Sequence, residues 1–151
     1  AECRGAIGAL AGSGTAGFLG DGGPVSSARL NAPRGMAFGP DGSLFIADTA
    51  NSRIRRVAPD GTISTFAGGV AASACSYTGP VSGLGLNQPY DVAVDGAGNV
   101  IIADAGANCV RRVDTAGNVT RVAGGGATTT CNSTGAATAV SLSSPRGVAV
   151  D

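Results

Sequence analysis

The chemistry open to this sequence is narrow, because its 151 residues include ten acidic side chains and four cysteines but no histidine. Without histidine, these residues cannot build a Ser-His-Asp or Cys-His catalytic centre or a His-ligated metal site. The glycine-rich segment 124–126 is not followed by the Gly-Lys-Ser/Thr sequence of a phosphate-binding loop. The residue types therefore predict no catalytic residue, no metal ligand and no cofactor, and we expect a protein that is not an enzyme.

An even number of cysteines together with two Asn-x-Ser/Thr sequences indicates an oxidising compartment. We therefore expect an extracellular or cell-surface location, a disulfide bond and N-linked glycans. The alternatives are free buried thiols and Asn-x-Ser/Thr sequences that arise by chance. The cysteines are Cys3, Cys75, Cys109 and Cys131, and the candidate glycosylation sites are Asn118 and Asn132.

The charges of the chain are balanced, with ten basic and ten acidic residues. Proteins that bind nucleic acid usually carry a basic surplus, so no nucleic-acid partner is expected. Arginines cluster at Arg53, Arg55, Arg56, Arg111 and Arg112, where we expect them to face outward from strands and to pair with carboxylates. No apolar run approaches the ~20 residues that span a bilayer, so no membrane insertion is expected.

A repeat of 56 residues organises the chain. Residues 30–69 return as residues 86–125 with 15 of 40 positions identical and no gap, and a third copy begins at residue 142. Internal repetition at this length is typical of propellers, solenoids and arrays. The chain holds about 2.7 repeats.

Each complete repeat contains four short apolar runs separated by turn sequences, which is the pattern of a four-stranded antiparallel propeller blade. The sequence thus predicts an all-β protein. The expected strands cover 35–38, 43–47, 53–57 and 62–67 in one repeat, and 91–94, 99–103, 109–113 and 118–123 in the next. A helical turn is expected within residues 24–30, and further strands at 6–10 and 147–150.

These elements divide the chain into four parts. We expect residues 1–12 to hold the last strand of a preceding blade, and residues 13–69 a connector plus a blade. Residues 70–125 are expected to repeat that arrangement, and residues 126–151 to hold a connector plus the first strand of the next blade. Fewer than about four blades cannot close a propeller ring, so we expect the partners to be other proteins or further blades of the same protein.

The motifs Pro-x-Gly, Ile-Ala-Asp, Asn-x-Arg-Ile-Arg-Arg-Val and Gly-x-Ile-x-Thr-Phe-Ala-Gly resemble those of the NHL-repeat β-propeller family. The long connector resembles the subtype found in large secreted and cell-surface proteins. The resemblance implies that the chain is part of a larger propeller, commonly one of six blades. The repeat-motif residues are Pro33, Gly35, Asp48, Arg53, Pro89, Asp104 and Pro145.

The resemblance also suggests where an enzyme of this fold would bind metal. Lactonase-like propellers hold a central calcium with acidic and asparagine side chains, for which Asp48, Asp95 and Asp104 are the candidates here. Asp48 and Asp104 are equivalent repeat positions, which favours a structural role in which each caps its strand end.

The second repeat departs from the motif, because Cys109 replaces Arg53 and Ala107 replaces Asn51. A contact of Asp48 with the Asn/Arg pair should therefore be missing from the second repeat, and a disulfide could replace it. The direction of the strands places Cys109 on the same face as the connectors that carry Cys75 and Cys131. We predict that Cys109 bonds one of these two, with Cys131 slightly preferred.

The sequence thus favours an extracellular structural or protein-interaction module without catalytic activity. The alternative is a lactonase- or lyase-like propeller enzyme whose metal site lies outside these residues. RNA binding, known for some NHL propellers, would require a basic face.

Overall fold

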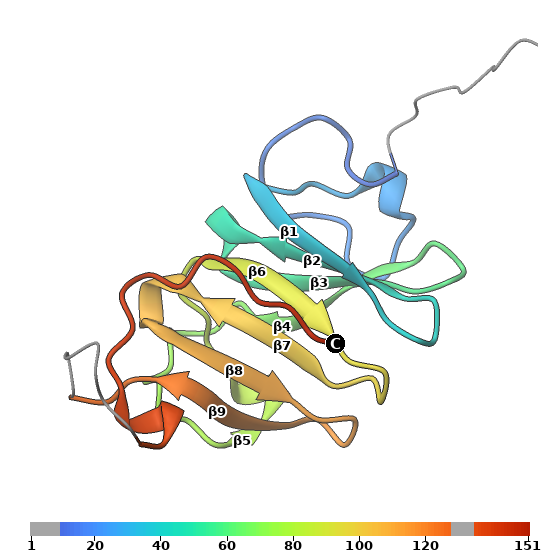
Figure 1. Ribbon diagram of the computed structural model, residues 1–151. Helices are drawn as coiled ribbons and strands as arrows, with labels where there is room; N and C mark the ends of the chain where they lie inside the picture. The colour runs from blue at the N-terminus through green and yellow to red at the C-terminus, as the bar shows by residue number, and fades with distance from the viewer. Residues whose placement is uncertain (1–9, 128–134) are drawn as a thin grey trace, which may run out of the picture.

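Two antiparallel sheets pack side by side in the computed structural model, which describes residues 10–127 and 135–151. The first sheet has the order β1-β2-β3-β4 (Figure 1), with every neighbouring pair antiparallel. The prediction of an all-β fold built of four-stranded antiparallel blades is confirmed. The strands are β1 (Pro33–Phe38), β2 (Leu44–Asp48), β3 (Arg53–Val57) and β4 (Ile63–Gly68).

The second sheet repeats this order and gains one short strand. Gly79–Pro80 of the connector forms β5, which pairs with the outermost strand β9. In the first repeat the equivalent Pro24 makes only an isolated bridge to Thr62, so the first sheet keeps four strands. The remaining strands are β6 (Pro89–Val94), β7 (Val100–Asp104), β8 (Cys109–Val113) and β9 (Asn118–Gly124).

Helical structure in the described residues is limited to single 3₁₀ turns. Val25–Ser27 forms one of them directly after Pro24, within the segment expected to make a helical turn. The others are Thr49–Asn51, Val81–Gly83, Ala105–Ala107 and Ala137–Ala139. The hairpin turns depend on glycines that adopt the left-handed backbone, such as Gly42 at φ 81° and the equivalent Gly98 at φ 89°.

The third repeat begins with the same backbone geometry as the other two. Ala32, Gln88 and Ser144 occupy one repeat position, and all three have a positive φ near 50°. The segment after Pro145 runs beside β6 in Figure 1, and the Val148 N–H donates to Asp91 Oδ2 at 3.0 Å. Residues 147–150 form no strand in the structure, so the strand expected there is absent from the described residues. Nearly all of the expected strand at 6–10 lies outside the described residues.

The main hydrophobic core lies between the two sheets. Side chains of the first sheet, including Phe45, Ala47 and Ile54, pack against Val92, Val100, Ile102 and other residues of the second. Phe45 also meets Phe66 edge to face, with ring centroids 5.0 Å apart. Since neither sheet encloses this core alone, the pairing of successive repeats buries it.

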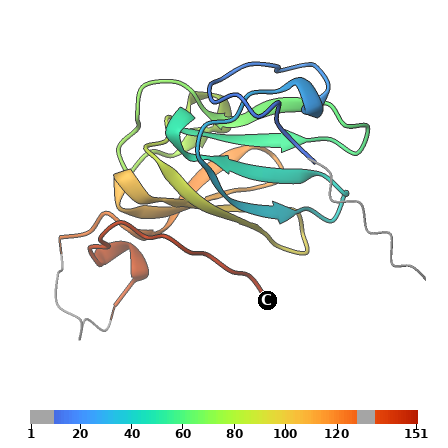
Figure 2. The same cartoon turned by 90° about the horizontal axis from the view of Figure 1, so that it is seen from above.

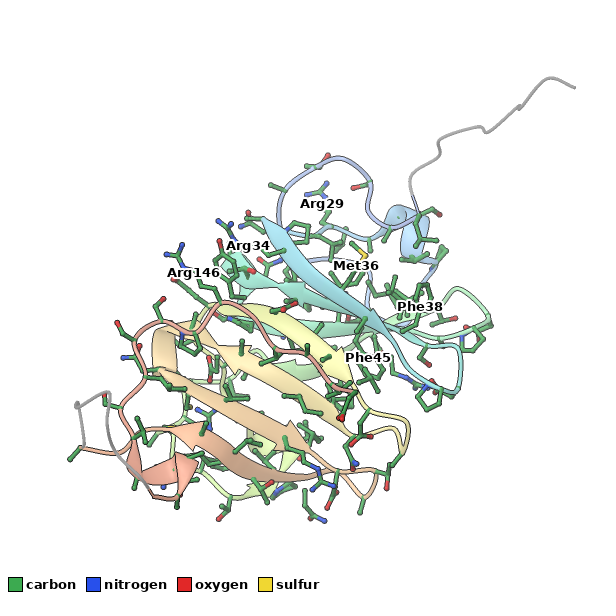
Figure 3. All side chains as sticks on the ribbon, viewed as in Figure 1. Arg29, Arg34, Met36, Phe38, Phe45 and Arg146 are labelled. Carbon is green, nitrogen blue, oxygen red and sulfur yellow. The ribbon has the colours of Figure 1, made fainter. Side chains whose placement is uncertain are left out.

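The opposite flank of the first sheet has only a partial cover. A smaller cluster of Leu44, Ile46, Val57 and Ile63 is covered by the connector through Val25, Ala28 and Leu30. At the inner strand nothing covers Met36, which is 62% exposed, whereas the equivalent Val92 is 2% exposed beneath the first sheet. Figure 3 shows Met36 and Phe38 on the side of β1 away from the second sheet. Figure 2 shows the first connector and the C-terminal segment on opposite sides of the pair of sheets.

The inner strands β1 and β6 approach each other closely at Gly35, where a β-carbon would overlap the side chain and backbone of Asp91. At the equivalent Gly147 a β-carbon would lie 4.0 Å from Asp91 Oδ2, which is an ordinary contact. We therefore expect Gly35→Ala to lower the free energy of unfolding by about 1–3 kcal/mol through overpacking. Gly147→Ala should change it by less than about 0.5 kcal/mol. Urea denaturation of both variants measures the difference. Equal effects would contradict the close approach. Asp91→Gly should rescue Gly35→Ala only in part, because the Asp91 backbone also lies too close to the added β-carbon.

Candidate functional site

Two buried carboxylates anchor the connectors to the blades. Asp48 and Asp104 end β2 and β7, and both are 0% exposed. The Asn31 N–H donates to Asp48 Oδ1 at 2.7 Å, and the equivalent Asn87 N–H donates to Asp104 Oδ1 at 2.8 Å. Each carboxylate thus fixes the point where a connector turns into its blade.

The second oxygen of each carboxylate has a different partner in the two repeats. In the first repeat Asn51 Nδ2 donates to Asp48 Oδ2 at 2.8 Å. In the second repeat alanine replaces that asparagine, and Arg111 Nε donates to Asp104 Oδ2 at 2.8 Å instead. Burial raises the pKa of Asp104, while the hydrogen bonds from Asn87 and Arg111 act in the opposite direction.

Arg55 of β3 and Arg111 of β8 are buried, which the sequence did not predict. Arg55 and Arg111 are 0% exposed, so the expectation that they face outward is wrong. The connectors cover this face: Arg55 pairs with Asp21 and lies 3.5 Å from Asp48, and Arg111 donates to the carbonyls of Ser73 and Ala74.

Arg53 does not bind Asp48, contrary to the expected contact with the Asn/Arg pair. Its guanidinium stacks on Phe18 of the connector, 3.8 Å from the ring centroid. The aromatic ring attracts the Arg53 cation. Asp48 is bound by Asn51 and Arg55 instead. Of the expected contacts with the Asn/Arg pair, only the hydrogen bond to Asn51 is present.

The second repeat replaces this cation–aromatic contact with a pair of thiols. Cys109 occupies the position of Arg53, is fully buried and lies close to Cys75 of the connector. Both thiols are free. Burial raises the pKa of Cys109 to about 12, so its thiol stays protonated at neutral pH. Cys3 and Cys131 lie outside the described residues, as does Asn132.

Asn118, the other candidate glycosylation site, is exposed at the start of β9. Its amide nitrogen donates to Asp114 Oδ2 at 3.2 Å, and its backbone N–H donates to Asp114 Oδ1 at 2.8 Å. These hydrogen bonds lower the pKa of Asp114. The side chain therefore sits in an accessible hairpin turn.

The proline positions of the repeat motif open the inner strands. Pro33 is exposed, and Pro89 is buried where its carbonyl accepts a hydrogen bond from Thr49 Oγ1 at 2.8 Å. Pro145 is the equivalent proline of the third copy.

Sequence reasoning missed the residues that follow the motif prolines. Arg34 Nη1 donates to the Tyr90 hydroxyl at 2.7 Å, and the guanidinia of Arg34 and Arg146 lie 4.4 and 5.1 Å from the Tyr90 ring centroid. Asp91 stands where the motif has glycine. An alignment of the three repeats shows both differences. The position after the proline holds Arg34, Tyr90 and Arg146, and the next position holds Gly35, Asp91 and Gly147.

A groove of about 360 Å³ separates the two blades at the hairpin end. Phe45, Phe66, Val94 and Val100 line it, with the ion pair of Arg56 and Asp41 at its edge. The hydrogen bonds from Ser43 and Arg56 lower the pKa of Asp41 to about 2.

Across residues 10–127 and 135–151 no group of three His, Cys, Asp or Glu side chains is placed to hold a metal ion. Over the same ranges no helix has the length and apolarity to cross a membrane.

The geometry and the sequence agree with one family. The family model described as the Teneurin NHL domain matches residues 6–82, which is about half of the chain. The chain therefore belongs to this family of NHL-repeat propeller domains, and the resemblance to NHL repeats is confirmed.

Curated relatives match over a shorter stretch. Human Teneurin-1 is 48% identical over 40 residues, which cover 26% of this chain and 2% of that protein. Chicken Teneurin-1 is 50% identical over 40 residues, with the same shares of both chains. The chain thus matches only a small part of these much longer proteins.

A solved structure shows the same fold over most of the chain. A structural-genomics protein from Bacteroides thetaiotaomicron superposes with a TM-score of 0.67 and 23% identity, covering 83% of this chain and 32% of that one. An auxiliary nutrient binding protein from the same organism gives a TM-score of 0.54 and 22% identity, with coverage of 74% and 28%. At this level of identity the likeness concerns the fold alone.

The contact between Cys75 and Cys109 favours a Cys75–Cys109 disulfide over the Cys109–Cys131 bond that the sequence slightly preferred. We expect peptide mapping by mass spectrometry without reductant to recover a Cys75–Cys109 linked peptide from protein made in an oxidising compartment. The bond should stabilise the fold by ~2–4 kcal/mol relative to the reduced protein. Cys75→Ser is the control in which this peptide should disappear. If denatured protein gains the same mass from alkylation with and without prior reduction, all of its thiols were free, and the prediction is contradicted.

Proposed function

We propose that this protein is a non-catalytic structural and interaction module of an extracellular or cell-surface protein, and that its blades serve as docking surfaces for further blades of the same kind. Membership of the Teneurin NHL domain family supports this role. The two Asn-x-Ser/Thr sequences and the adjacent Cys75 and Cys109 fit an extracellular setting.

One observation carries the proposal: the inner strand of this flank is buried in the second repeat and open in the first. In the second blade, Val92 of the inner strand is 2% exposed because the first blade packs on it. In the first blade the equivalent Met36 is 62% exposed and Phe38 of the same strand is 67% exposed. Leu10 of the preceding segment is 64% exposed. An apolar flank of this kind has a known cover in this molecule, namely the opposite face of another blade.

The opposite face of the second blade is open in turn. Phe45 and Phe66 of the first blade correspond to Ile101 and Val122 of the second, and Val122 is 42% exposed. The two open flanks therefore offer the same two types of surface that already pack together inside the chain.

Calcium binding of the lactonase kind has no geometric support among the candidate carboxylates. Asp48 and Asp104 are engaged by backbone N–H groups and by Asn51 or Arg111. Asp95 accepts three hydrogen bonds within its own hairpin turn, two of them from Asn99.

Glutamates on the open flank should prevent docking of a further blade. We expect the wild-type chain to self-associate in sedimentation equilibrium as its concentration rises. Met36→Glu with Phe38→Glu should weaken association at least tenfold, because burying each apolar side chain contributes about 1.5–3 kcal/mol. The matched control, Ser26→Glu with Thr115→Glu, adds the same charge at exposed positions away from the inner strand and should associate as the wild type does. A wild type that stays monomeric at every concentration, or equal association in all three proteins, would contradict the proposal.

A further inference from the structure

The innermost strands present a second feature, separate from the sheet flanks. Arg34, Tyr90 and Arg146 hold the same repeat position, one residue after the proline that opens each inner strand. Figure 3 shows Arg34 and Arg146 projecting from the same end of these strands. Three successive repeats therefore bring this position together at one end of the inner strands.

A single aromatic ring organises the three side chains. The Arg34 guanidinium lies 4.4 Å from the Tyr90 ring centroid and the Arg146 guanidinium 5.1 Å from the same centroid. The two cations are therefore closer to each other than the Debye length of about 10 Å at 0.1 M salt, so they repel each other. Contact with the ring offsets part of this repulsion.

Neither arginine has an acidic partner to neutralise it. The ion pairs within the described ranges involve Arg55, Arg56 and Arg111 only. The adjacent carboxylate of Asp91 is engaged by backbone, because its Oδ1 accepts from the Val92 N–H at 2.9 Å and its Oδ2 from the Val148 N–H at 3.0 Å. Two guanidinium groups face this one carboxylate, so the cluster keeps a net positive charge at an exposed edge.

The hydrogen-bonding groups of Arg34, Tyr90 and Arg146 that remain free are mainly donors. The Tyr90 hydroxyl accepts from Arg34 Nη1, which leaves its own hydrogen available, and each guanidinium has several unused N–H groups. A ligand that matches donors alone must supply acceptors and negative charge, which describes an oxyanion.

We propose that Arg34, Tyr90 and Arg146 form an oxyanion-binding site at the end of the inner strands. The oxyanion is either a free anion such as phosphate or the carboxylate of an acidic segment of a partner protein. Asp91 stabilises the site indirectly, because it ties the C-terminal segment, and with it Arg146, to Tyr90. The site does not depend on blade docking, so it can fail or succeed independently of the proposed scaffold role.

The two tyrosines of the chain allow a direct test. In the ¹³C-tyrosine-labelled protein, titration with inorganic phosphate or with a glutamate-rich hexapeptide should shift the Tyr90 NMR signals saturably. Tyr77, whose hydroxyl donates to the Pro80 carbonyl at 2.8 Å, should not shift and serves as the internal control.

Variants then test the residues. Arg34→Gln with Arg146→Gln should weaken binding at least tenfold, since each guanidinium offers charge-assisted hydrogen bonds. Arg29→Gln with Arg112→Gln removes the same charge elsewhere and should change binding less than about twofold, the extent expected for screened surface charges. Unchanged Tyr77 signals in each variant verify that the fold is intact.

The outcomes separate the two sources of the oxyanion. A shift with both probes, lost in the double variant, assigns a site for free oxyanions. A shift with the peptide alone, also lost in the double variant, assigns a site for acidic partner segments. No saturable shift with either probe, or equal weakening in the two double variants, would overturn the proposal.

Discussion

The packing of one repeat against the next is the interaction on which the rest of this structure depends. Each blade is a thin antiparallel sheet with apolar side chains on both faces, so it cannot bury both faces by itself. Phe45, Ala47 and Ile54 of the first blade close over Val92 and Ile102 of the second, and this contact forms the main core. The constant 56-residue period keeps these two surfaces in register from one repeat to the next.

Polar anchors fix the connectors that make this packing possible. Asp48 and Asp104 bind the backbone at the end of each connector, and the buried Arg55 and Arg111 bind connector groups from the blade side. A buried arginine is costly unless it is paired and hydrogen-bonded, so each requires its own carboxylate and carbonyl partners. The two repeats meet this requirement with different residues, which shows that the geometry is retained while the partners vary.

The strand pattern and the repeat were readable from the sequence because local turn chemistry and alternation determine them. The Pro-Asp-Gly and Gly-Ala-Gly turns mark the hairpins, and the bounds of β3 and β8 match the expected residues. The burial of Arg55 could not be predicted from the sequence, because alternation along a strand does not show that a connector will fold over the outer face of that strand. The Arg53–Phe18 contact was hidden for the same reason, since it joins segments far apart in the chain. The Arg34–Tyr90–Arg146 cluster could have been found by comparing equivalent positions, because only the repeat brings these residues together.

Amide hydrogen exchange tests most directly whether contact between repeats, and not pairing within a sheet, stabilises the fold. The two blades have the same strand order, but only the second has its inner flank covered by another blade. Amides of β6 should exchange far more slowly than amides of β1 at equivalent repeat positions. Equal protection in the two strands, or greater protection in β1, would show that each blade is stable by itself and would contradict this explanation of the fold.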